Sequence, residues 1–443
     1  MPIPNINPEK YVKLFNVNES VLLAYIEYNS RQKMGRFGLP NIEVLYLNGQ
    51  FYFKKQDIDK YDLSDRRVLS IIKKLRYLLE KYIKFCAKLK SLDFTHLPFT
   101  KQLYFYQQLV KNYEEVFTII DVPVYCESFV EKRIIENLKQ RGFGAKDFDI
   151  LSTPLYESFH KRRHLDFIKL KNKKISRSLF LKKWEWSNMA LFYFVPVDKA
   201  FIDTNLKEIK NPRVELQKID KKTKKDRANF YRLYNKLPKD LKQQADLMQE
   251  LIAIRDYRYE MFIKGAYYAK GLLVEIAKNL GVDYDGIINM SPPEVLLAKI
   301  PSDLNLRKKG FSVVKNKIYT GNDLSKIWDI FNKKQLKDEA KGSPANGGLV
   351  QGQVKIIKNN SELNKLKQGD ILVCEMTTPD YLAVVKKAAA IVTNLGGMTC
   401  HAAIISREFG IPAIVGTGNA TLVFKDGDLV EVDANRGIIK KIK

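Results

Sequence analysis

The residues that could carry out chemistry are concentrated in the stretch NLGGMTCHAAIISREFGIPAIVG, residues 394–416. This stretch contains His401, one of four histidines in the chain, directly after two glycines and a Met-Thr-Cys run. A neutral imidazole nitrogen is a competent nucleophile toward phosphorus. A lone histidine beside an apolar helix is more often a packing residue than a nucleophile. The residues around His401 must therefore decide between these two roles.

These neighbours favour phosphoryl transfer. Gly396 and Gly397 follow the strand-like run AAAIVT, so the backbone can turn sharply there and approach a ligand closely. Thr399 supplies a hydroxyl that suits a helix cap or a phosphate contact. His401 is then expected in the first turn of a helix, where unpaired N–H groups and the helix dipole favour an anion. Charge that develops on phosphoryl oxygens would meet these N–H groups while the imidazole forms the new bond.

Other chemistry is less well supported by the same residues. Ile404 and Ile405 occupy the helical positions where a second metal ligand would stand, so the sequence predicts no metal site. Cys400 and His401 would point about 100° apart on a helix, which disfavours a Cys-His nucleophile pair. The run GTGNAT, residues 416–421, lacks the Gly-Lys-Ser/Thr ending of a phosphate loop, and we interpret it as a turn.

The elements that position this loop form a pattern of their own. The runs LVQGQVKII, DILVCE, AAAIVTN, PAIVG and DLVEVDA predict strands, and TPDYLAVVKKA and CHAAIISREFG predict short helices. Alternating strands and helices are typical of a compact α/β domain, which we place at residues 349–443. The preceding residues 341–348 are rich in Gly, Ser, Pro and Asn, so we expect a hinge linker there.

Residues 1–340 are expected to be mainly helical. The pattern from Leu241 to Leu280 predicts one long helix, with Leu247, Leu251 and Ile254 on one face and a stop at Gly281. The run SPPE, residues 291–294, predicts a helix start with a capping box. The run IEVLYLNGQFYFKK predicts a small β-hairpin around Asn48-Gly49. We expect this region to subdivide near residue 130.

The stretch GGMTCHAAIISREFGIPAIVG resembles the phosphohistidine signature of the swivelling domain in phosphoenolpyruvate (PEP) synthase, pyruvate phosphate dikinase and their relatives, the PEP-utilising enzyme mobile domain. The flanking runs ILVCEMTTPDYLAVVKKAAAIVTNLGG, GLVQGQVKII and GDLVEVDANRGIIKKI resemble the other strands and helices of that domain. The resemblance covers residues 343–443. Leu395 departs from it, since a polar or charged residue is expected at its position.

The resemblance implies a role for each residue of the loop. The family's histidine, which corresponds to His401, takes a phosphoryl group from an ATP-derived donor at one active site and delivers it to an acceptor at another. Thr399 corresponds to the residue that assists the phosphate. Gly396 and Gly397 correspond to the paired glycines that let the loop enter a foreign active site, and Cys400 lies in the same loop.

The donor site is expected on another protein. The first 340 residues show no Gly-rich phosphate loop and no paired acidic metal ligands of an ATP-grasp domain. We therefore expect an ATP-grasp partner in trans that binds ATP and Mg²⁺, and no cofactor bound by this chain. The helical run through residues 254–298 resembles the middle helical region of rifampin phosphotransferase-like proteins, which implies that it binds a small-molecule acceptor.

Charged residues in the helical region are candidates for acceptor binding or docking. They are Arg255, Asp256 and Arg258, and the KRRH run at residues 161–164. The simpler interpretation of each is a solvated helix face. The chain carries a net charge of +26, yet the segment from Ser343 onward has 12 Lys/Arg against 9 Asp/Glu, so the excess lies in the first 342 residues. That excess attracts polyanions, although a solvated Lys-rich surface explains it as well.

Three functions remain open at this point. The first is a phosphotransferase component that acts through phosphohistidine, and the second is a non-catalytic phosphocarrier or regulatory descendant. The third is a nucleic-acid-binding protein, because residues 167–186 interleave bases with aromatic residues. That stretch contains no recognised nucleic-acid motif, so we expect no nucleic-acid partner. The four cysteines lack CxxC spacing and no long apolar run occurs, which predicts a cytoplasmic protein without a membrane span.

Overall fold

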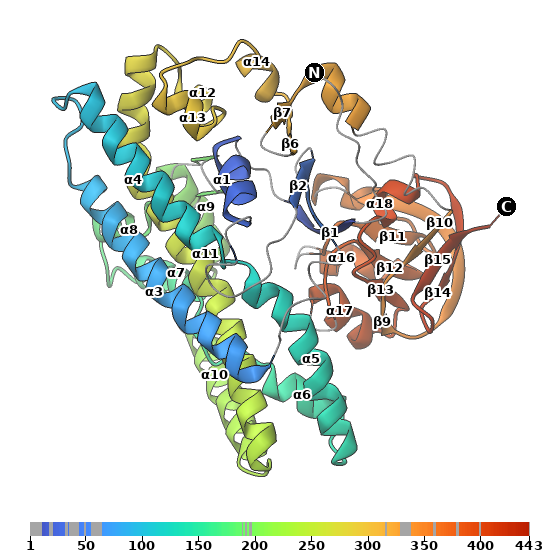
Figure 1. The fold of residues 1–443 in the computed structure, drawn as a ribbon. Coiled ribbons are helices and arrows are strands. Elements are labelled where there is room, and N and C mark those ends of the chain that lie inside the picture. Colours follow the sequence, from blue (N-terminus) through green and yellow to red (C-terminus); the bar gives the residue numbers. More distant parts are fainter. Residues whose placement is uncertain are drawn as a thin grey trace. The chain divides into compact units, whose positions relative to one another are not determined.

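The computed structural model describes residues 11–16, 21–31, 34, 44–47, 50–54, 64–187, 189–190, 193–194, 197–314, 317–327, 338–357, 360–377, 381–397 and 400–442. The chain divides into two compact units (Figure 1). The first, here the helical unit, comprises Glu19–Asn41 and Tyr61–Lys309. The second, here the sheet unit, comprises Met1–Asn18, Ile42–Lys60 and Gly310–Lys443. A mainly helical region followed by an α/β domain, as expected from the sequence, is confirmed.

The helical unit is built almost wholly from helices. They are α1 (Val21–Arg31), α3 (Asp65–Lys90), α4 (Phe99–Phe117), α5 (Val122–Gln140), α6 (Ala145–Leu151), α7 (Phe159–Lys171), α8 (Arg177–Trp184), α9 (Lys199–Glu208), α10 (Pro212–Tyr234), α11 (Lys239–Leu280), α12 (Tyr284–Ile288), α13 (Pro292–Leu296) and α14 (Leu304–Arg307). A short ribbon of β4 (Met189–Ala190) and β5 (Tyr193–Phe194) completes it.

The long helix α11 is the centre of this unit, with α3, α4 and α5 packed against it (Figure 1). Its side chains Leu247, Leu251 and Ile254 are buried, which confirms the predicted apolar face. The helix ends at Gly281, as predicted. Burying several Leu and Ile side chains along one helix stabilises the unit by about 1.5–3 kcal/mol for each fully buried side chain.

Aromatic side chains fill the interior where α3, α4 and α11 meet. The rings of Tyr82 and Tyr113 have centroids 5.1 Å apart, and those of Tyr113 and Phe262 are 5.7 Å apart. The hydroxyl of Tyr82 lies 3.1 Å from that of Tyr113 and 3.3 Å from the carbonyl oxygen of Phe262. The buried hydroxyls are therefore hydrogen-bonded, as burial of polar groups requires.

Two further predictions for this region have different outcomes. The subdivision near residue 130 is not found, because α5 runs unbroken from Val122 to Gln140. The capping box of SPPE is confirmed, since Oε2 of Glu294 lies 2.8 Å from both the backbone nitrogen and the hydroxyl of Ser291. The guanidinium of Arg307 in α14 donates hydrogen bonds to both oxygens of the same carboxylate, over 2.7 and 2.9 Å.

The predicted hairpin is part of a larger sheet. Strands β2 (Val44–Leu47) and β3 (Gln50–Lys54) pair antiparallel, and the Asn48-Gly49 turn lies outside the described residues. They are joined by β1 (Tyr11–Asn16), β6 (Ser312–Val314) and β7 (Lys317–Tyr319) in the order β1-β3-β2-β6-β7. The hairpin therefore pairs with β6, a segment more than 250 residues further along the chain.

The C-terminal domain holds an eight-stranded sheet in the order β8-β15-β14-β10-β11-β12-β13-β9. The strands are β8 (Glu339–Lys341), β9 (Ser343–Asn346), β10 (Leu349–Ile357), β11 (Ile371–Cys374), β12 (Ala390–Thr393), β13 (Ala413–Val415), β14 (Leu429–Asp433) and β15 (Ile438–Lys441). Strands β10 to β13 are parallel. Strands β11, β12 and β13 are buried throughout, which explains their unbroken apolar runs.

Short helices accompany these strands and cover the apolar faces. They are the 3₁₀ helix η3 (Asn360–Lys365) and the α-helices α16 (Leu382–Val385), α17 (His401–Phe409) and α18 (Ala420–Val423). One apolar cluster includes Leu372, Ile391 and Ala403 of α17, and another includes Val373, Val392 and Val423 of α18. Neighbouring residues of one strand thus pack in different clusters, as the alternation of side chains along a strand requires.

The expected hinge linker at residues 341–348 is instead largely β-structure. Strand β8 pairs with β15, and β9 pairs with β13. The small residues of this segment allow close backbone approach, since a Cβ at Gly342 would lie 2.6 Å from the carbonyl oxygen of Val415. The Gly, Ser and Pro residues of this segment therefore serve close packing of backbones. For this reason the composition of residues 341–348 wrongly indicated a hinge linker.

The sheet is strongly curled. Strands β8 and β9 stand at opposite ends of the strand order, yet only Gly342 separates them in sequence. A flat eight-stranded sheet would place its edge strands about 30 Å apart, which one residue cannot span.

Among the residues that the structure describes, no helix combines the length and apolar character needed to cross a bilayer.

Candidate functional site

The loop that contains the candidate residues connects β12 to α17. The buried strand β12 ends at Thr393, and His401 is the first residue of α17. Cys400 precedes the helix in an extended conformation, and its N–H donates to the carbonyl of Gly397 over 3.1 Å. Thr399 lies outside the described residues. Because the first N–H groups of a helix have no partner within it, the position of His401 next to these groups is as the sequence predicts.

Two glycines allow this loop to fold tightly. Gly396 has a φ of +118°, and a Cβ there would lie 2.6 Å from Sγ of Cys400. Gly416 has a φ of +73°, and a Cβ there would lie 2.8 Å from the carbonyl oxygen of Gly396. Only glycine adopts such angles readily and fits such gaps. The exposed Gly397 follows Gly396 at the surface of the loop.

Asn394 fixes the base of the loop. Its side chain is buried, and its Nδ2 donates to Oε2 of Glu375 over 2.7 Å and to Oγ1 of Thr421 over 2.6 Å. Its Oδ1 accepts from the backbone N–H of Thr421 over 3.1 Å and from the hydroxyl of Thr417 over 3.3 Å. One buried amide thus binds residues that follow β11 and β13, at the carboxyl ends of the parallel strands.

The run GTGNAT therefore has a role that the sequence did not reveal. Thr417 donates from its hydroxyl to the carbonyl of Thr393 over 3.0 Å, and its backbone N–H donates to the same oxygen over 3.0 Å. The N–H of Gly418 donates to the carbonyl of Asn394 over 2.9 Å. The signal that could have indicated this role is Asn394 itself, a polar residue directly after a buried apolar strand.

Cys374, which ends the neighbouring strand β11, is unsuited to nucleophilic catalysis. Burial raises the pKa of the Cys374 thiol far above its ordinary value, and the Glu375 carboxylate acts in the same direction. Because the thiolate is the reactive form, Cys374 is inert at neutral pH. All four cysteines of the chain are free thiols. Among the residues that the structure describes, no group of three His, Cys, Asp or Glu side chains could hold a metal ion.

The candidates on α11 take part in interactions with neighbouring helices. Arg255 forms an ion pair with Glu127 over 2.6 Å, and Arg258 forms one with Asp121 over 2.6 Å. Asp256 accepts from the backbone N–H of Phe159 over 3.2 Å. Burial raises the pKa of the Asp256 carboxyl, and the hydrogen bond from Phe159 offsets only part of that effect. These three side chains therefore contact other helices of the helical unit.

Every residue of the KRRH run also has a partner in the helical unit. Lys161 donates to the hydroxyl of Thr223 over 2.9 Å, and Arg162 pairs with Glu260. Arg163 donates to the carbonyl of Ser187 over 2.7 Å, and His164 lies 2.7 Å from Glu215. The KRRH run therefore connects α7 with α10, with α11 and with the segment after α8. These contacts give the four side chains a structural role.

Residues 366–437, which include the whole loop and His401, match the family model of the PEP-utilising enzyme, mobile domain. The C-terminal domain of this chain is thus similar to that mobile domain over this segment. The "Probable phosphoenolpyruvate synthase" of Methanothermobacter thermautotrophicus is 56% identical over 99 residues, 22% of this chain and 14% of that protein. The "Phosphoenolpyruvate synthase" of Escherichia coli is 52% identical over 103 residues, 23% and 13% of the two chains.

A longer match reaches beyond this domain. The "Probable phosphoenolpyruvate synthase" of Staphylothermus marinus is 39% identical over 175 residues, 39% of this chain and 20% of that protein. Such a match is longer than Gly310–Lys443, so it includes part of the helical unit. In each of these three cases the matched segment is one fifth or less of the relative's length. The similarity to rifampin phosphotransferase-like proteins stays a prediction.

Solved structures add nothing to this assignment. The Enzyme I (nEIt) structure aligns over 86% of this chain and 81% of its own, at 16% identity and a TM-score of 0.19. The Thermococcus kodakaraensis aconitase X structure aligns over 24% of this chain, at 18% identity and a TM-score of 0.20.

Proposed function

We propose that this chain is a phosphotransferase component that carries a phosphoryl group on His401. The observation that supports this most is the mobile-domain match over residues 366–437, with His401 at the start of α17 behind a tightly folded glycine turn. A lone pair on an imidazole nitrogen attacks the phosphorus of an ATP-derived donor. The N–P bond forms as the P–O bond to the leaving group breaks, and that oxygen keeps the electron pair.

The N-terminal end of α17 supplies the electrostatic part of this step. Negative charge on the equatorial oxygens of the phosphoryl group would be stabilised by the unpaired N–H groups of the first helical turn. Thr399 would add a hydroxyl donor. Gly396 and Gly397 allow the loop a close approach to the donor, and the Asn394 network holds its base still during the transfer.

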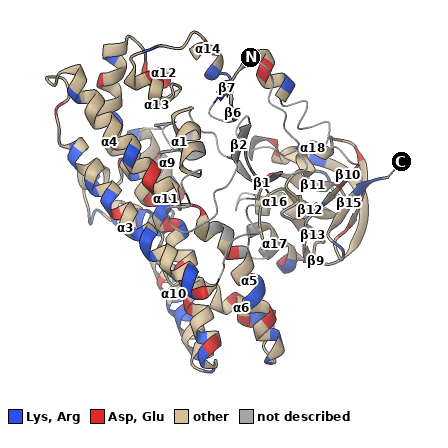
Figure 2. Ribbon diagram, viewed as in Figure 1, with Lys and Arg blue, Asp and Glu red and all other residues tan. Residues whose placement is uncertain are grey.

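The donor site is proposed on a partner protein of the ATP-grasp class, where ATP and Mg²⁺ act. The helical unit would bind the small-molecule acceptor, whose nucleophilic group then attacks phosphorus and releases the imidazole. Helices α3 and α10 carry 9 and 8 Lys/Arg against 2 and 3 Asp/Glu, and the colours of Figure 2 mark their positions along both ribbons. A basic surface of this kind would speed association with a nucleotide-loaded partner.

Phosphorylation of His401 is directly testable. The chain is incubated with labelled ATP and a cell extract or a candidate partner, and the expected product carries an acid-labile, base-stable label. His401→Ala should remove the label, whereas His96→Ala, a change at an exposed histidine of the helical unit, should retain it. Label that persists in His401→Ala would contradict the proposal.

The same experiment separates a transferase from a carrier. If the helical unit binds the acceptor, an added acceptor discharges the label from the full chain. If the label transfers only to another protein, the chain is a non-catalytic phosphocarrier. Tight binding of a single-stranded oligonucleotide with a steep dependence on salt, in the absence of any label, would instead favour a nucleic-acid-binding protein.

A further inference from the structure

The outer surface of α10 carries a row of positive charges. Its members are exposed and are spaced three, one, three and seven positions apart: Lys218, Lys221, Lys222, Lys225 and Arg232. At 3.6 residues per turn, these side chains fall within about 100° of one another and extend about 21 Å along the helix axis. They are called the basic stripe below.

No carboxylate forms an ion pair with the basic stripe. Residues 197–314 are all described, so the acidic residues nearest to the stripe in sequence are placed, and none of them is paired with it. Glu215 of the same helix lies 2.7 Å from His164 instead. Nη2 of Arg232 donates to Oδ1 of Asn229 over 2.7 Å, and this neutral amide leaves the charge of the guanidinium intact. The stripe therefore keeps all of its charge.

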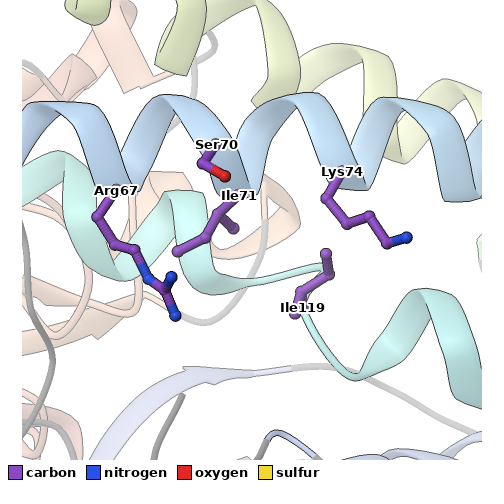
Figure 3. Close-up of a pocket in the computed structure, with 5 residues that line it drawn as sticks. All are labelled: Arg67, Ser70, Ile71, Lys74 and Ile119. Atoms are coloured by element: carbon purple, nitrogen blue, oxygen red, sulfur yellow. The ribbon is translucent and has the colours of Figure 1, made fainter. Parts of the chain in front are cut away.

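The other strongly basic helix, α3, differs in this respect. Its Arg76 is paired with Glu250 over 2.9 Å. Arg67 and Lys74 line a small pocket, and Figure 3 shows them on the side of α3 that faces the turn carrying Ile119. Basic residues of α3 are thus engaged within the helical unit, whereas those of the basic stripe extend into solvent.

Contacts on another side of α10 hold the stripe outward. The helix packs against α6 and α7, its Phe230 and Leu233 are buried, and Oγ1 of Thr223 accepts from Nζ of Lys161 over 2.9 Å. Thr223 and Phe230 project about 130–150° away from the middle of the stripe. The packing that fixes α10 in the helical unit therefore leaves the stripe free to contact another molecule.

A second row of cations lies on the other flank of the exposed side. Its members are exposed and lie about 110–170° from the middle of the stripe: Arg213, Lys224 and Arg227. Asp220 lies among them and offsets one charge, while Gln217 and Ala228 lie between the two rows. The exposed side of α10 thus has positive charge along both flanks and small or neutral side chains in the middle.

This pattern favours a nucleic acid over other polyanions. Protein interfaces have an apolar core that is poor in lysine, and helices on membrane surfaces bury an apolar face in the lipid. Between Lys218 and Arg232, the large apolar side chain that α10 exposes is Tyr231, which lies about 130° from the middle of the stripe. A nucleic-acid strand instead presents a line of phosphates, one for about every 3.4 Å of duplex axis.

We propose that α10 binds double-stranded DNA along its major groove, with the basic stripe on the phosphates of one strand and the second row on those of the other. The major groove of B-form DNA is about 12 Å wide and admits an α-helix, whereas that of A-form RNA is too deep and narrow for side chains. Single strands are bound by stacking on aromatic side chains, and the stripe has none. Because lysines act as point charges on phosphates, binding should be independent of sequence.

This inference goes beyond phosphoryl transfer and does not depend on it. It also differs from the expectation of no nucleic-acid partner, which considered only residues 167–186. His401→Ala should bind DNA as the wild type does. Loss of labelling with intact DNA binding would contradict only the proposed function, and labelling without DNA binding would contradict only the assignment of α10.

The test is fluorescence anisotropy of a labelled DNA duplex of about 20 base pairs, titrated with the full chain between about 50 and 200 mM salt. The logarithm of the binding constant should fall linearly with the logarithm of the salt concentration, by about 0.9 for each phosphate contacted. Two duplexes of unrelated sequence should bind equally. Absence of binding, or binding that does not depend on salt, would overturn the proposal.

Matched pairs of substitutions locate the site. Lys218→Gln with Lys225→Gln should weaken binding about tenfold or more and make the salt slope shallower by about 1.8, since two phosphate contacts are lost. Lys218→Arg with Lys225→Arg keeps both charges and should stay within about twofold of the wild type. Lys299→Gln with Lys309→Gln removes the same charge at two exposed lysines outside α10, and it should change affinity less than about twofold. Equal losses in the two Gln pairs would show that only the net charge attracts DNA, which would overturn the proposal.

Competitors test other occupants of the stripe. They are the unlabelled single strand, an RNA duplex of the same sequence and polyglutamate, each at equal charge concentration. Each should displace the labelled duplex less effectively than unlabelled duplex DNA does. A competitor that matches duplex DNA would show that the stripe binds that polyanion, and the assignment to DNA would be wrong. Circular dichroism melting curves confirm that each variant is folded, and Lys222→Gln with Arg232→Gln replaces a Gln pair on the stripe that is not.

Discussion

Asn394 and Thr421 are joined at two points. Nδ2 of Asn394 donates to Oγ1 of Thr421 over 2.6 Å, and the backbone N–H of Thr421 donates to Oδ1 of Asn394 over 3.1 Å. Asn394 follows β12 and Thr421 belongs to α18, so this double contact links the base of the His401 loop to a helix on a different connection.

Asn394→Ala should therefore affect both stability and the loop. Its removal leaves the partner groups of a buried amide unsatisfied, and we expect a loss of about 1–3 kcal/mol in the free energy of unfolding. The rate of His401 labelling should fall further than stability alone explains. Urea unfolding and the labelling assay measure the two effects. Asn419→Ala, at a residue whose side chain makes no capping bond, should change both quantities much less.

Gly396→Ala should be more destabilising than an alanine at another glycine of positive φ. Gly410 has a φ of +67° with no atom within 4 Å of an added Cβ, so Gly410→Ala carries only the conformational cost, about 1–2 kcal/mol. Gly396→Ala adds a close contact with Sγ of Cys400. Equal losses of unfolding free energy in the two variants would show that the loop readily rearranges around Cys400.

Arg307→Met should leave a partly buried carboxylate unpaired. Burial raises the pKa of Glu294, but its hydrogen bonds and ion pair with Arg307 outweigh that effect and hold the pKa below its ordinary value. Breaking a buried ion pair costs about 3–5 kcal/mol. A lowered pKa means that this stabilisation is present at neutral pH and is lost as the pH falls through the folded-state value. The difference between wild type and variant, measured by urea unfolding, should therefore shrink in acid.

The contribution of Glu260 to stability should have the opposite dependence on pH. Burial raises the pKa of its carboxyl, and Arg162 offsets only part of that increase. A raised pKa stabilises the fold most below the ordinary carboxyl value, and the contribution is lost as the pH rises through the folded-state value. As the pH rises above the ordinary carboxyl value of about 4.3, the stability of the wild type should therefore fall relative to that of Glu260→Gln. Parallel stability curves for the two proteins would contradict this assignment.

Local patterns in the sequence predicted those elements whose structure depends on near neighbours. The apolar runs of β10 to β14, the stop of α11 at Gly281 and the start of α17 at His401 are all found in the structure. Each depends on side-chain periodicity or on a residue within one turn of it.

Features that depend on distant contacts were not predictable in this way. The Asn394 network joins three connections that meet only in the folded sheet. The pairing of β2 with β6 is a similar case, since nothing in either segment specifies its partner. The partners of KRRH were also unforeseen, because a basic run has the same sequence whether it contacts solvent or other helices.

The single residue between β8 and β9 has one more consequence. Because these two strands are the ends of the strand order, the two outermost edges of the sheet comprise seven residues, and one of these strands, β9, contains Pro344. Free edges are where unrelated chains add strands and aggregate, and short edges that contain proline resist this. Such short outer edges would limit intermolecular β-pairing of this domain.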